Sequence, residues 1–457
     1  MATQKNGNFP TVCVTKCLSV HPKSLQPQQI LSLSNLDRQC PLLMYLVFFY
    51  KPTSVYQNLS LDLVFRKLKS GLEETLSVWY PAAGRLSLNP NDGKLNIWCN
   101  NKGAILVEAV TQVKISELGD LFQYNEFLEK LVYKPVFNGN FAEMPLVVAQ
   151  VTRFGCGGYS VGIGTSHSLF DGPGSYDFLR AWASNSAIMK DKGGIEVHKP
   201  VHERGRMGMT NSHVAKSAMA PRAAAIDHLY MLIKNALGAG QNLSEMGNMN
   251  YVTKTFHLSG AMIESFKRKV FGQGRGNFSC SSFELVAAHI WKARTKAMGV
   301  KKEAMVCLQF AVDTRNKMVP PLPKGFSGNA FVLASVALTA GELEQGSHEG
   351  IVEKIKKAKN SINNDYVNAY NEALEGPQGT LPPLKELTLV SDWTRMPFHN
   401  VDFVHGEADA ASPLISPIPQ VAYFMQNPTD VKGIDVRIGL LPQTVNAFSH
   451  YFLNNLH

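Results

Sequence analysis

The stretch Tyr159-Ser-Val-Gly-Ile-Gly-Thr-Ser-His167, followed by Ser-Leu-Phe-Asp171-Gly-Pro-Gly174, combines an apolar strand, a histidine and a glycine-rich turn. Its first part, Tyr159 to Thr165, has the composition of a buried strand. A strand that ends on a histidine holds that side chain rigidly, while the turn lets it project into a cleft. Imidazole is the side chain whose proton affinity suits a base near neutral pH. His167 is therefore a candidate general base.

Asp171 follows His167 by four residues and has two structural interpretations. It can cap the helix that Tyr176 to Ala183 predicts, or it can be the buried partner of an ion pair. His-x3-Asp pairs also arise by chance, so the spacing alone does not assign a catalytic role.

The sequence does not contain the patterns of other common kinds of site around His167. No Gly-Lys-Ser/Thr follows the local glycines, so a phosphate-binding loop is not indicated. The absence of Gly-x-Ser-x-Gly removes the common serine hydrolase arrangement. His198, His202 and His213 lack further ligands at zinc spacing, so we expect no metal site.

The length of 457 residues predicts two domains, and a content of 45% hydrophobic and 18% charged residues is that of a globular protein. Lys and Arg number 45 against 36 Asp and Glu, a formal charge of +9, which fits an anionic ligand such as a nucleotide diphosphate. Nucleic acid would fit the charge as well. However, no basic run is interleaved with aromatic residues and no nucleic-acid-binding motif is present, so we expect no nucleic-acid partner.

Cysteine usage and apolar segments suggest the compartment. The seven cysteines are scattered, odd in number and without a CxxC pair, which favours buried thiols in a reducing environment over a disulfide framework. Residues 1–10 lack the apolar core of a secretory signal. The longest apolar stretch, Pro41 to Tyr50, is about half of a bilayer span. We expect a cytoplasmic protein without a membrane span.

The chain divides into two regions of alternating strand and helix patterns around a different middle segment. Residues 190–250 are basic, polar and weakly periodic, which is typical of a crossover loop between domains. We therefore expect an N-terminal domain at 1–189 that carries the His167 segment and a C-terminal domain at 251–457. Alternating strands and helices in both favour the α/β class. In the second region, Ser281 and Glu284 predict a capping box before a helix from Phe283 to Ala297.

Four distant segments extend the pattern around His167. They are Leu33-Ser-Asn-Leu-Asp37 leading to Phe48-Phe49-Tyr50, Leu68-Lys-Ser-Gly-Leu72 leading to Tyr80-Pro-Ala-Ala-Gly-Arg-Leu86, Ser282-Phe-Glu284 with Ala288-His-Ile-Trp291, and Val312-Asp-Thr-Arg315 with Pro320-Pro-Leu-Pro-Lys-Gly325 and Gly328-Asn329. In this order around an HxxxD-Gly centre, they resemble the plant BAHD acyltransferase family over nearly the whole chain.

The resemblance implies two domains like those of chloramphenicol acetyltransferase, each a mixed sheet with flanking helices, joined by a long crossover loop. It implies a channel between them in which acyl-CoA, as co-substrate, meets a small-molecule acceptor. No permanently bound cofactor is implied, and relatives are typically monomers. His167 would act as general base in direct transfer without an acyl-enzyme. Asp171 would form a structural pair with Arg315 that sets the loop carrying the histidine.

One motif departs from the family. The usual Asp-Phe-Gly-Trp-Gly appears as Asp402-Phe403-Val404-His405-Gly406, in which Asp402, Phe403 and Gly406 match. In relatives this motif is mainly structural, and its tryptophan has been assigned an indole N–H that could meet the oxyanion. We hypothesise that His405 donates an N–H in its place; the alternative is that His405 only fills a changed surface.

A second position bears on the acceptor. Trp393-Thr-Arg395-Met-Pro397 resembles relatives in which an arginine grips the carboxylate of an acidic acceptor, although that arginine also occurs in members with other acceptors. Arg395 is therefore a candidate acceptor-binding residue.

The sequence thus predicts transfer of an acyl group from acyl-CoA to a hydroxyl, in preference to an amine, of a plant metabolite. Two alternatives remain at this point. The chain could be a non-catalytic relative that acts as the partner of a lipid-elongating enzyme, or it could hydrolyse thioesters without an acceptor. Donor, acceptor and the choice between ester and amide product are not encoded in a form that one sequence reveals.

Overall fold

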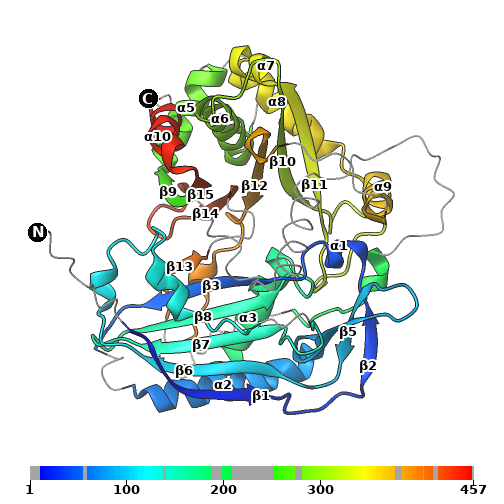
Figure 1. The fold of residues 1–457 in the computed structure, drawn as a ribbon, viewed down its shortest axis with the longest axis vertical. Coiled ribbons are helices and arrows are strands. Elements are labelled where there is room, and N and C mark those ends of the chain that lie inside the picture. Colours follow the sequence, from blue (N-terminus) through cyan, green and yellow to red (C-terminus); the bar gives the residue numbers. More distant parts are fainter. Residues whose placement is uncertain are drawn as a thin grey trace, which may run out of the picture.

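The structure is a computed structural model that describes residues 11–54, 59–136, 140–187, 198–207, 251–272, 280–375, 383–404, 406–414 and 420–454. It has α/β architecture with two large mixed sheets, each flanked by helices. Figure 1 shows the first sheet in the lower half of the molecule and the second in the upper half. The expected fold class is confirmed.

The first sheet has the strand order β1-β6-β7-β8-β3-β13. Its strands are β1 (Cys13–Val20), β6 (Ala104–Val110), β7 (Val147–Arg153), β8 (Tyr159–Ser166), β3 (Leu43–Tyr50) and β13 (Ala410–Pro413). Helices α2 (Leu61–Val78) and α3 (Gly172–Ser186) pack on one face, and the Trp182 indole of α3 donates to the Leu68 carbonyl of α2 at 2.8 Å. β8 is buried along its whole length, as its composition predicts.

Strand β13 comes from the C-terminal region yet completes this sheet. It pairs antiparallel with β3, with Ala410 opposite Phe49 and Pro413 opposite Leu46. Figure 1 shows β13, in orange, beside β3, in blue. Residues 251–457, expected as a C-terminal domain, therefore supply one strand to the sheet of the N-terminal region.

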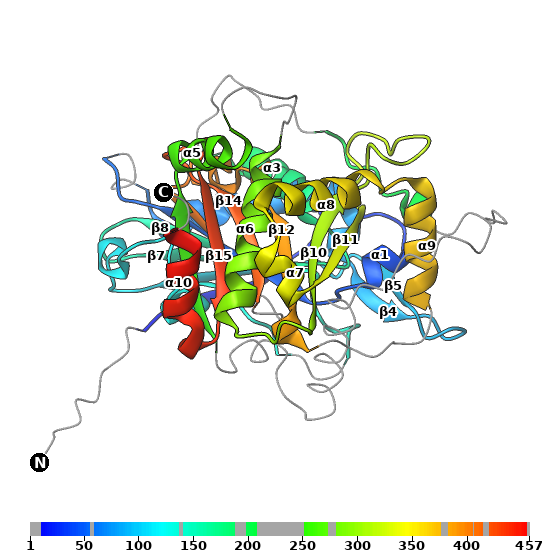
Figure 2. The ribbon, with the colours of Figure 1, turned by 90° about the horizontal axis from the view of Figure 1, so that it is seen from above.

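The second sheet has the order β11-β10-β12-β14-β15-β9. Its strands are β11 (Phe331–Thr339), β10 (Met305–Asp313), β12 (Leu387–Asp392), β14 (Val421–Gln426), β15 (Ile434–Leu440) and β9 (Val252–Leu258). The helices of this half are α5 (Gly260–Phe271), α6 (Ser282–Ala297), α7 (Ala340–Gln345), α8 (His348–Asn360), α9 (Asn364–Glu375) and α10 (Val445–Leu453). Figure 2 shows α5, α6, α8 and α10 lying across the outer face of this sheet.

Smaller elements join these layers. A three-stranded sheet consists of β2 (Gln29–Ser32), β5 (Leu95–Cys99) and β4 (Arg85–Leu88), and the short helix α1 spans Asn35–Arg38. Turns of 3-10 helix are η2 (Tyr80–Ala83), η3 (Ile115–Leu118), η4 (Glu126–Leu131), η5 (Arg204–Met207), η7 (Leu384–Glu386), η8 (Phe398–Asn400) and η9 (Pro442–Thr444).

Local sequence signals explain where the helices begin. Ser281 and Glu284 form the predicted capping box of α6. Trp291 of this helix is fully buried in the hydrophobic core of the half that holds the second sheet. α3 starts earlier than the predicted Tyr176, because Asp171 caps it and Pro173 fits its first turn. The early start places the beginning of α3 directly beside the end of β8.

Of the expected crossover at 190–250, only residues 198–207 are among those described. This segment contacts both halves: Val201 forms a bridge with Phe326, and His202 lies 2.8 Å from the Ser327 hydroxyl through Nδ1. The Nε2 atom of His202 is 3.2 Å from the Val78 carbonyl at the end of α2.

Candidate active site

A cavity of about 850 Å³ lies between the two large sheets. Residues of β3, β10, β12 and β14 line it, and so do four residues that the sequence singled out: His167, Asp171, Arg315 and Arg395. A concave, mostly apolar site with a few polar groups is the usual form of a small-molecule site. The fold thus brings together side chains that lie up to 228 positions apart in the sequence.

His167 sits one residue beyond β8, where its backbone N–H donates to the Leu42 carbonyl at 2.9 Å. The ring is half-buried at the cavity and lies 5.7 Å from the Phe331 ring of β11, centroid to centroid. Its Nδ1 atom is 3.1 Å from the Oδ1 atom of Asn329. The imidazole is therefore held on one side and open to the cavity on the other.

The amide of Asn329 determines which ring nitrogen of His167 carries the proton. The Nδ2 group donates to the Asp37 carboxylate at 3.0 Å and to the His167 carbonyl at 2.7 Å, and both partners only accept. The Oδ1 atom must then be the atom that faces the ring, and it also only accepts. Nδ1 of neutral His167 therefore carries the hydrogen, and Nε2 keeps its lone pair.

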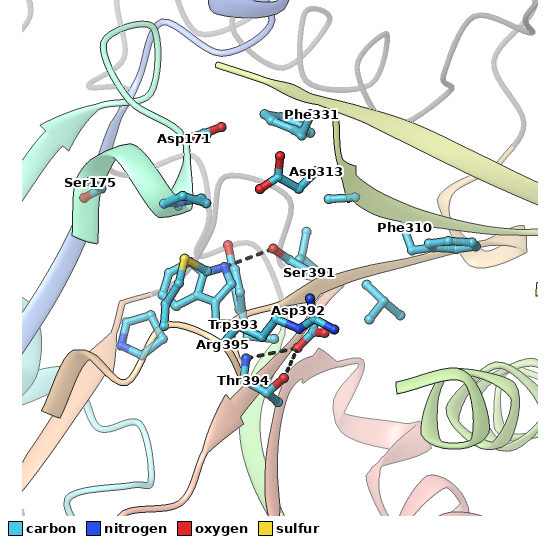
Figure 3. Close-up of a pocket in the computed structure, with 18 of the residues that line it drawn as sticks. Asp171, Ser175, Phe310, Asp313, Phe331, Ser391, Asp392, Trp393, Thr394 and Arg395 are labelled. Carbon is cyan, nitrogen blue, oxygen red and sulfur yellow. Dashed lines mark hydrogen bonds between the residues drawn. The ribbon is translucent and has the colours of Figure 1, made fainter. Parts of the chain in front are cut away.

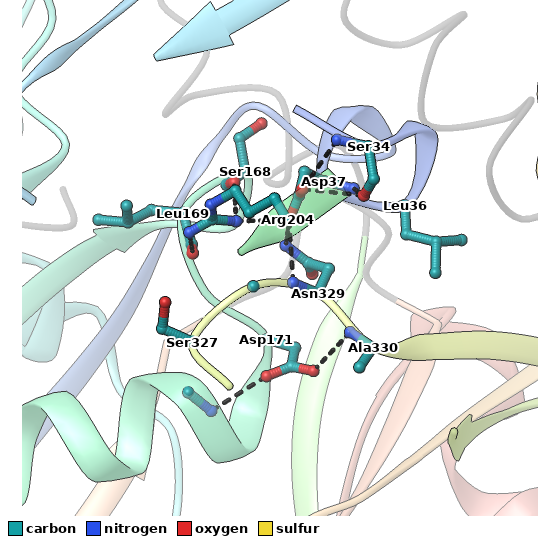
Figure 4. A network of polar contacts seen from close by, with 12 residues as sticks. Ser34, Leu36, Asp37, Ser168, Leu169, Asp171, Arg204, Ser327, Asn329 and Ala330 are labelled. Atoms are coloured by element: carbon teal, nitrogen blue, oxygen red, sulfur yellow. Dashed lines mark hydrogen bonds and ion pairs between the residues drawn. The ribbon is translucent and has the colours of Figure 1, made fainter. Parts of the chain in front are cut away.

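Asp37 is itself fixed by a buried ion pair. One oxygen accepts from the Arg204 guanidinium at 2.6 Å and from the Asn329 backbone N–H at 2.9 Å. Both charged side chains are almost completely buried, at 0% exposed for Arg204 and 1% for Asp37. Arg204 also donates to the Leu169 carbonyl at 2.6 Å, within the HxxxD loop. Figure 4 shows Asp37 between Ser34, Arg204 and Asn329.

Asp171 fulfils both structural interpretations at once. It caps α3 by accepting from the Gly174 N–H at 3.0 Å, and it forms two parallel hydrogen bonds of 2.8 Å with Arg315. A further bond of 3.0 Å comes from the Ala330 N–H, also visible in Figure 4. Burial would raise the pKa of Asp171, but the Arg315 charge and these hydrogen bonds outweigh it and hold the pKa below its ordinary value. Both carboxylate oxygens are occupied, so this group holds the loop in place.

Arg315 connects the two halves around that loop. Besides Asp171 it donates to the carbonyls of Phe326 at 3.2 Å and Gly328 at 3.1 Å. Burial opposes its charge, but the neighbouring Asp171 and Asp313 carboxylates raise the pKa of Arg315 above its ordinary value. The pairing expected from the family resemblance is present in the structure.

The described residues of the altered motif, Asp402, Phe403, Val404 and Gly406, are not part of the cavity wall. His405 is outside the described residues. Phe403 is buried and packs edge-on against Phe48 at 5.4 Å and Trp182 at 5.0 Å between ring centroids. Its backbone N–H donates to the Tyr50 hydroxyl at 3.1 Å. Phe403 thus anchors the motif to the first sheet.

Arg395 is exposed on the loop after β12 and lines the cavity with its neighbours. Figure 3 shows it beside Asp392, Trp393 and Thr394. Asp392 accepts from the Thr394 N–H at 3.0 Å and hydroxyl at 2.7 Å, and the Trp393 indole donates to the Ser391 hydroxyl at 3.0 Å. These bonds stiffen the loop that presents the arginine.

The two ends of the cavity differ in chemistry. Toward the first sheet the wall is apolar and aromatic, with Met44, Leu46, Trp393, Met396 and Phe398. The second half contributes lysines and the start of α6, with Lys317, Lys359, Lys432, Ser281 and Ser282. Lysines beside a helix N-terminus suit phosphate groups, whereas the apolar end suits a hydrophobic molecule.

Three residues of the site had no role assigned from sequence. Asp37 and Asn329 lie in segments that match the family, and Arg204 lies in the weakly periodic crossover. The sequence showed Asp37 and the Gly328-Asn329 pair as parts of those segments, but nothing local tied them to His167. Asn329 is 162 positions from that histidine, so only the fold brings them together.

Several expectations concern whole classes of site. Within the described residues, no cluster of three His, Cys, Asp or Glu side chains could hold a metal ion. No helix in that part of the chain is long and apolar enough to cross a membrane. All seven cysteines are free thiols, but the expectation that they are buried is wrong for most of them: only Cys40 and Cys99 are buried, and Cys13 and Cys17 are exposed.

Comparisons with known proteins show the family of the chain. Residues 11–454 match the family model described as Transferase family. The chain is 57% identical over 454 residues to brassinosteroid-related acyltransferase 1 of Arabidopsis thaliana, covering 96% of this chain and 97% of that protein. It is 29% identical to fatty alcohol:caffeoyl-CoA acyltransferase of the same plant, covering 94% and 95%. The crystal structure of vinorine synthase has a similar fold, with a TM-score of 0.74 at 20% identity, over 97% of this chain and 98% of that one.

Proposed function

Because the chain belongs to the Transferase family of plant BAHD acyltransferases, and is thus an acyl-CoA-dependent acyltransferase, we propose that it esterifies a hydroxyl of a plant metabolite with His167 as general base. The observation that carries this proposal is the tautomer of His167. Asn329 occupies Nδ1, so Nε2 is the nitrogen left with a lone pair at the cavity.

The proposed reaction runs without an acyl-enzyme. Nε2 of His167 removes the proton from the acceptor hydroxyl, and the oxygen forms a bond to the thioester carbonyl carbon. The tetrahedral intermediate then breaks its carbon–sulfur bond. The imidazolium returns its proton to the leaving thiolate, which restores the neutral base and yields ester and free coenzyme A. Asn329 can accept the Nδ1 hydrogen throughout this cycle, so the ring keeps its orientation.

The division of the cavity supports an orientation for the two substrates. The lysine end, with Lys317, Lys359 and Lys432, would receive the phosphates of coenzyme A. The apolar end around Met44 and Met396 would receive the acceptor. His167 directly follows the strand that borders the apolar end and would reach the thioester where the two molecules meet.

The apolar wall also favours an alcohol of a largely hydrophobic metabolite over a strongly acidic acceptor. Two relatives fit this choice by name, one being brassinosteroid-related and the other acting on fatty alcohols. Arg395 stays our proposed contact for a polar group of the acceptor, at the rim of the same cavity. We further propose that the protein acts as a cytoplasmic monomer.

His405 remains our proposed oxyanion donor. Replacing it by Phe should lower turnover on the order of 10²-fold without unfolding the protein if its N–H meets the oxyanion. Unchanged turnover in a folded His405→Phe variant would leave only the alternative role, that of filling a changed surface.

The central test is release of free thiol from a panel of acyl-CoA donors in the presence of apolar alcohols, with the products identified by mass spectrometry. Ester products that depend on the alcohol support the proposal. Thiol release without any alcohol would indicate thioester hydrolysis instead. Equal turnover by wild type and His167→Ala would contradict a general-base role, whereas no thiol release from any donor would support the non-catalytic alternative.

A further inference from the structure

Two hydroxyl groups interrupt the apolar end of the cavity. Thr165 is near the end of β8 and is 7% exposed, and Ser175 lies in the first turns of α3. Both line the cavity, and their side-chain oxygens are 3.5 Å apart. Figure 3 shows Ser175 on the side of the cavity away from Phe310 of the second sheet.

The neighbours of this pair are apolar. Thr165 is directly opposite Met44 in the β3–β8 ladder, so the two side chains share one face of the sheet. Met396 lies against Gly172, at the start of the helix that carries Ser175, and Phe398 packs edge-on against Tyr176 at 5.3 Å. The hydroxyl pair is therefore a polar spot within a wall of methionine and aromatic side chains.

The two hydroxyls do not satisfy each other well. Hydrogen bonds between hydroxyls usually measure about 2.7–2.8 Å, so a separation of 3.5 Å is at the outer limit. Within the described part of the chain, each has only the other as a side-chain hydrogen-bond partner. Every hydroxyl offers one donor and two acceptor lone pairs. A third oxygen can lie about 2.8 Å from both, which would complete their hydrogen bonding.

We propose that Thr165 and Ser175 bind a second oxygen of the acceptor, a hydroxyl or carbonyl other than the one that becomes acylated. This inference rests on the proposed O-acylation, because it places the reacting hydroxyl at His167. The acceptor class is then a rigid, largely apolar molecule that carries at least two oxygens. A simple fatty alcohol would leave the Thr165–Ser175 pair without a partner.

The chain also indicates how far apart the two oxygens lie. Thr165 is in β8 and His167 is in the turn that directly follows the strand, and both residues line the same cavity. Two residues of extended chain span at most roughly 7 Å, so the two backbone positions are no farther apart than that. We therefore place the second oxygen roughly 7 Å from the reacting hydroxyl, on a different ring of the acceptor.

The test compares two matched probe acceptors with the intact protein. One is a rigid steroid diol whose hydroxyls lie roughly 7 Å apart, and the other is the same steroid without the second hydroxyl. We expect wild type to favour the diol about tenfold in kcat/KM, as two neutral hydrogen bonds would provide. Thr165→Val with Ser175→Ala should remove this preference, so that the ratio of kcat/KM for the diol to kcat/KM for the mono-ol falls from about ten to about one.

A matched control lies on the same helix. Ser186 of α3 donates to the Trp182 carbonyl at 2.8 Å and does not line the cavity, so Ser186→Ala should keep the tenfold preference. Ser175→Ala alone covers the case in which the double variant does not fold, and it should lose part of the preference. The inference fails if wild type turns over both probes without preferring the diol, or if the preference survives in the variants. Either result would leave the proposed function standing. If wild type transfers acyl groups to no alcohol at all, the proposed function fails, and this inference fails with it.

Discussion

Two histidine sites in this molecule, one at the cavity and one in the core, have different chemistry. His167 has a neutral amide on Nδ1 and the cavity on its other side, whereas His289 in α6 is 2% exposed and uses both nitrogens within the core. Its Nε2 is 2.8 Å from the Phe452 carbonyl of α10, and its Nδ1 is 3.2 Å from Nε2 of His348. A ring held by a polar contact is common to both sites, so what distinguishes the candidate base is the nitrogen left open to the cavity.

We expect the largest loss of turnover from removing the His167 ring and, with it, the Nε2 atom that is open to the cavity. His167→Ala should lower kcat by about 10²–10⁴-fold with little change in Tm, because positioned proton transfer contributes that much. Steady-state thiol release and thermal unfolding of the same preparations measure both quantities. His289→Ala is the counterpart and should do the reverse, lowering Tm while the folded fraction keeps its turnover. A large turnover loss in His289→Ala at full folding would break the distinction.

The next effect concerns the loop that carries His167. Arg315→Met leaves the buried Asp171 carboxylate without its main partner, which should cost about 3–5 kcal/mol of unfolding free energy. Urea unfolding followed by fluorescence measures this loss. Adding Asp171→Asn to Arg315→Met should restore part of it, because the unpaired charge disappears. A double variant no more stable than the single one would argue against the ion pair as the cause.

Asn329 tests whether tautomer control matters in its own right. Asn329→Ala should lower kcat on the order of ten- to a hundredfold, because either tautomer and more ring orientations become accessible. The KM for acyl-CoA should change little. Asn329→Asp keeps an acceptor at Nδ1 but places a second carboxylate next to Asp37, so its pH–rate profile should move relative to wild type. A kcat for Asn329→Ala within about twofold of wild type would leave His167 correctly oriented by its strand alone.

The last effect is the response of the His289–His348 site to acid. Burial lowers the pKa of His289 to about 4, and burial together with the His289 charge lowers that of His348 to about 3, both from an ordinary value of 6.5. Unfolded chains bind protons at these sites below about pH 6.5 while the folded protein does not, so stability is full above that pH and falls as the pH drops toward 4. The slope should reach up to about 1.4 kcal/mol per pH unit for each histidine.

Urea midpoints between pH 7 and 4.5 measure that slope. Burial also lowers the pKa of His202 to about 4, so His202 contributes to the pH dependence as well. Wild type is therefore compared with a His289→Gln, His348→Asn variant, which keeps His202 and removes only the histidine pair. The variant should show a shallower slope. An equal slope would mean that the histidine pair does not govern acid sensitivity.

The parts of the site that could be predicted from the sequence are those whose signals lie within a short stretch of residues. The apolar strand before His167, the cap at Asp171 and the Ser281–Glu284 box all show in short windows, and the structure contains each of them. The Asp171–Arg315 pair lay beyond any window and came from the family resemblance, since 144 positions separate its members.

The residues that the sequence did not predict are those whose role depends on contacts with distant parts of the chain. Arg204 lies in a segment without periodicity, yet it is completely buried against Asp37. Asn329 appeared in the sequence only as part of the Gly328-Asn329 pair, and only the hydrogen bonds to Asp37 and His167 fix its amide. A sequence window carries no information about such partners, because the contacts depend on how the two halves meet.

Strand β13 lies far along the sequence from its partner β3, and this distance has a consequence for the synthesis of the protein. On the ribosome, β3 is complete at residue 50, but its neighbour at the sheet edge begins only at residue 410. At ~5–20 residues per second, translation leaves that edge without its final strand for on the order of tens of seconds. An unpaired strand edge is a template for wrong pairing. Nascent chains stalled or truncated before residue 410 should therefore depend on chaperones and aggregate more readily than the finished protein.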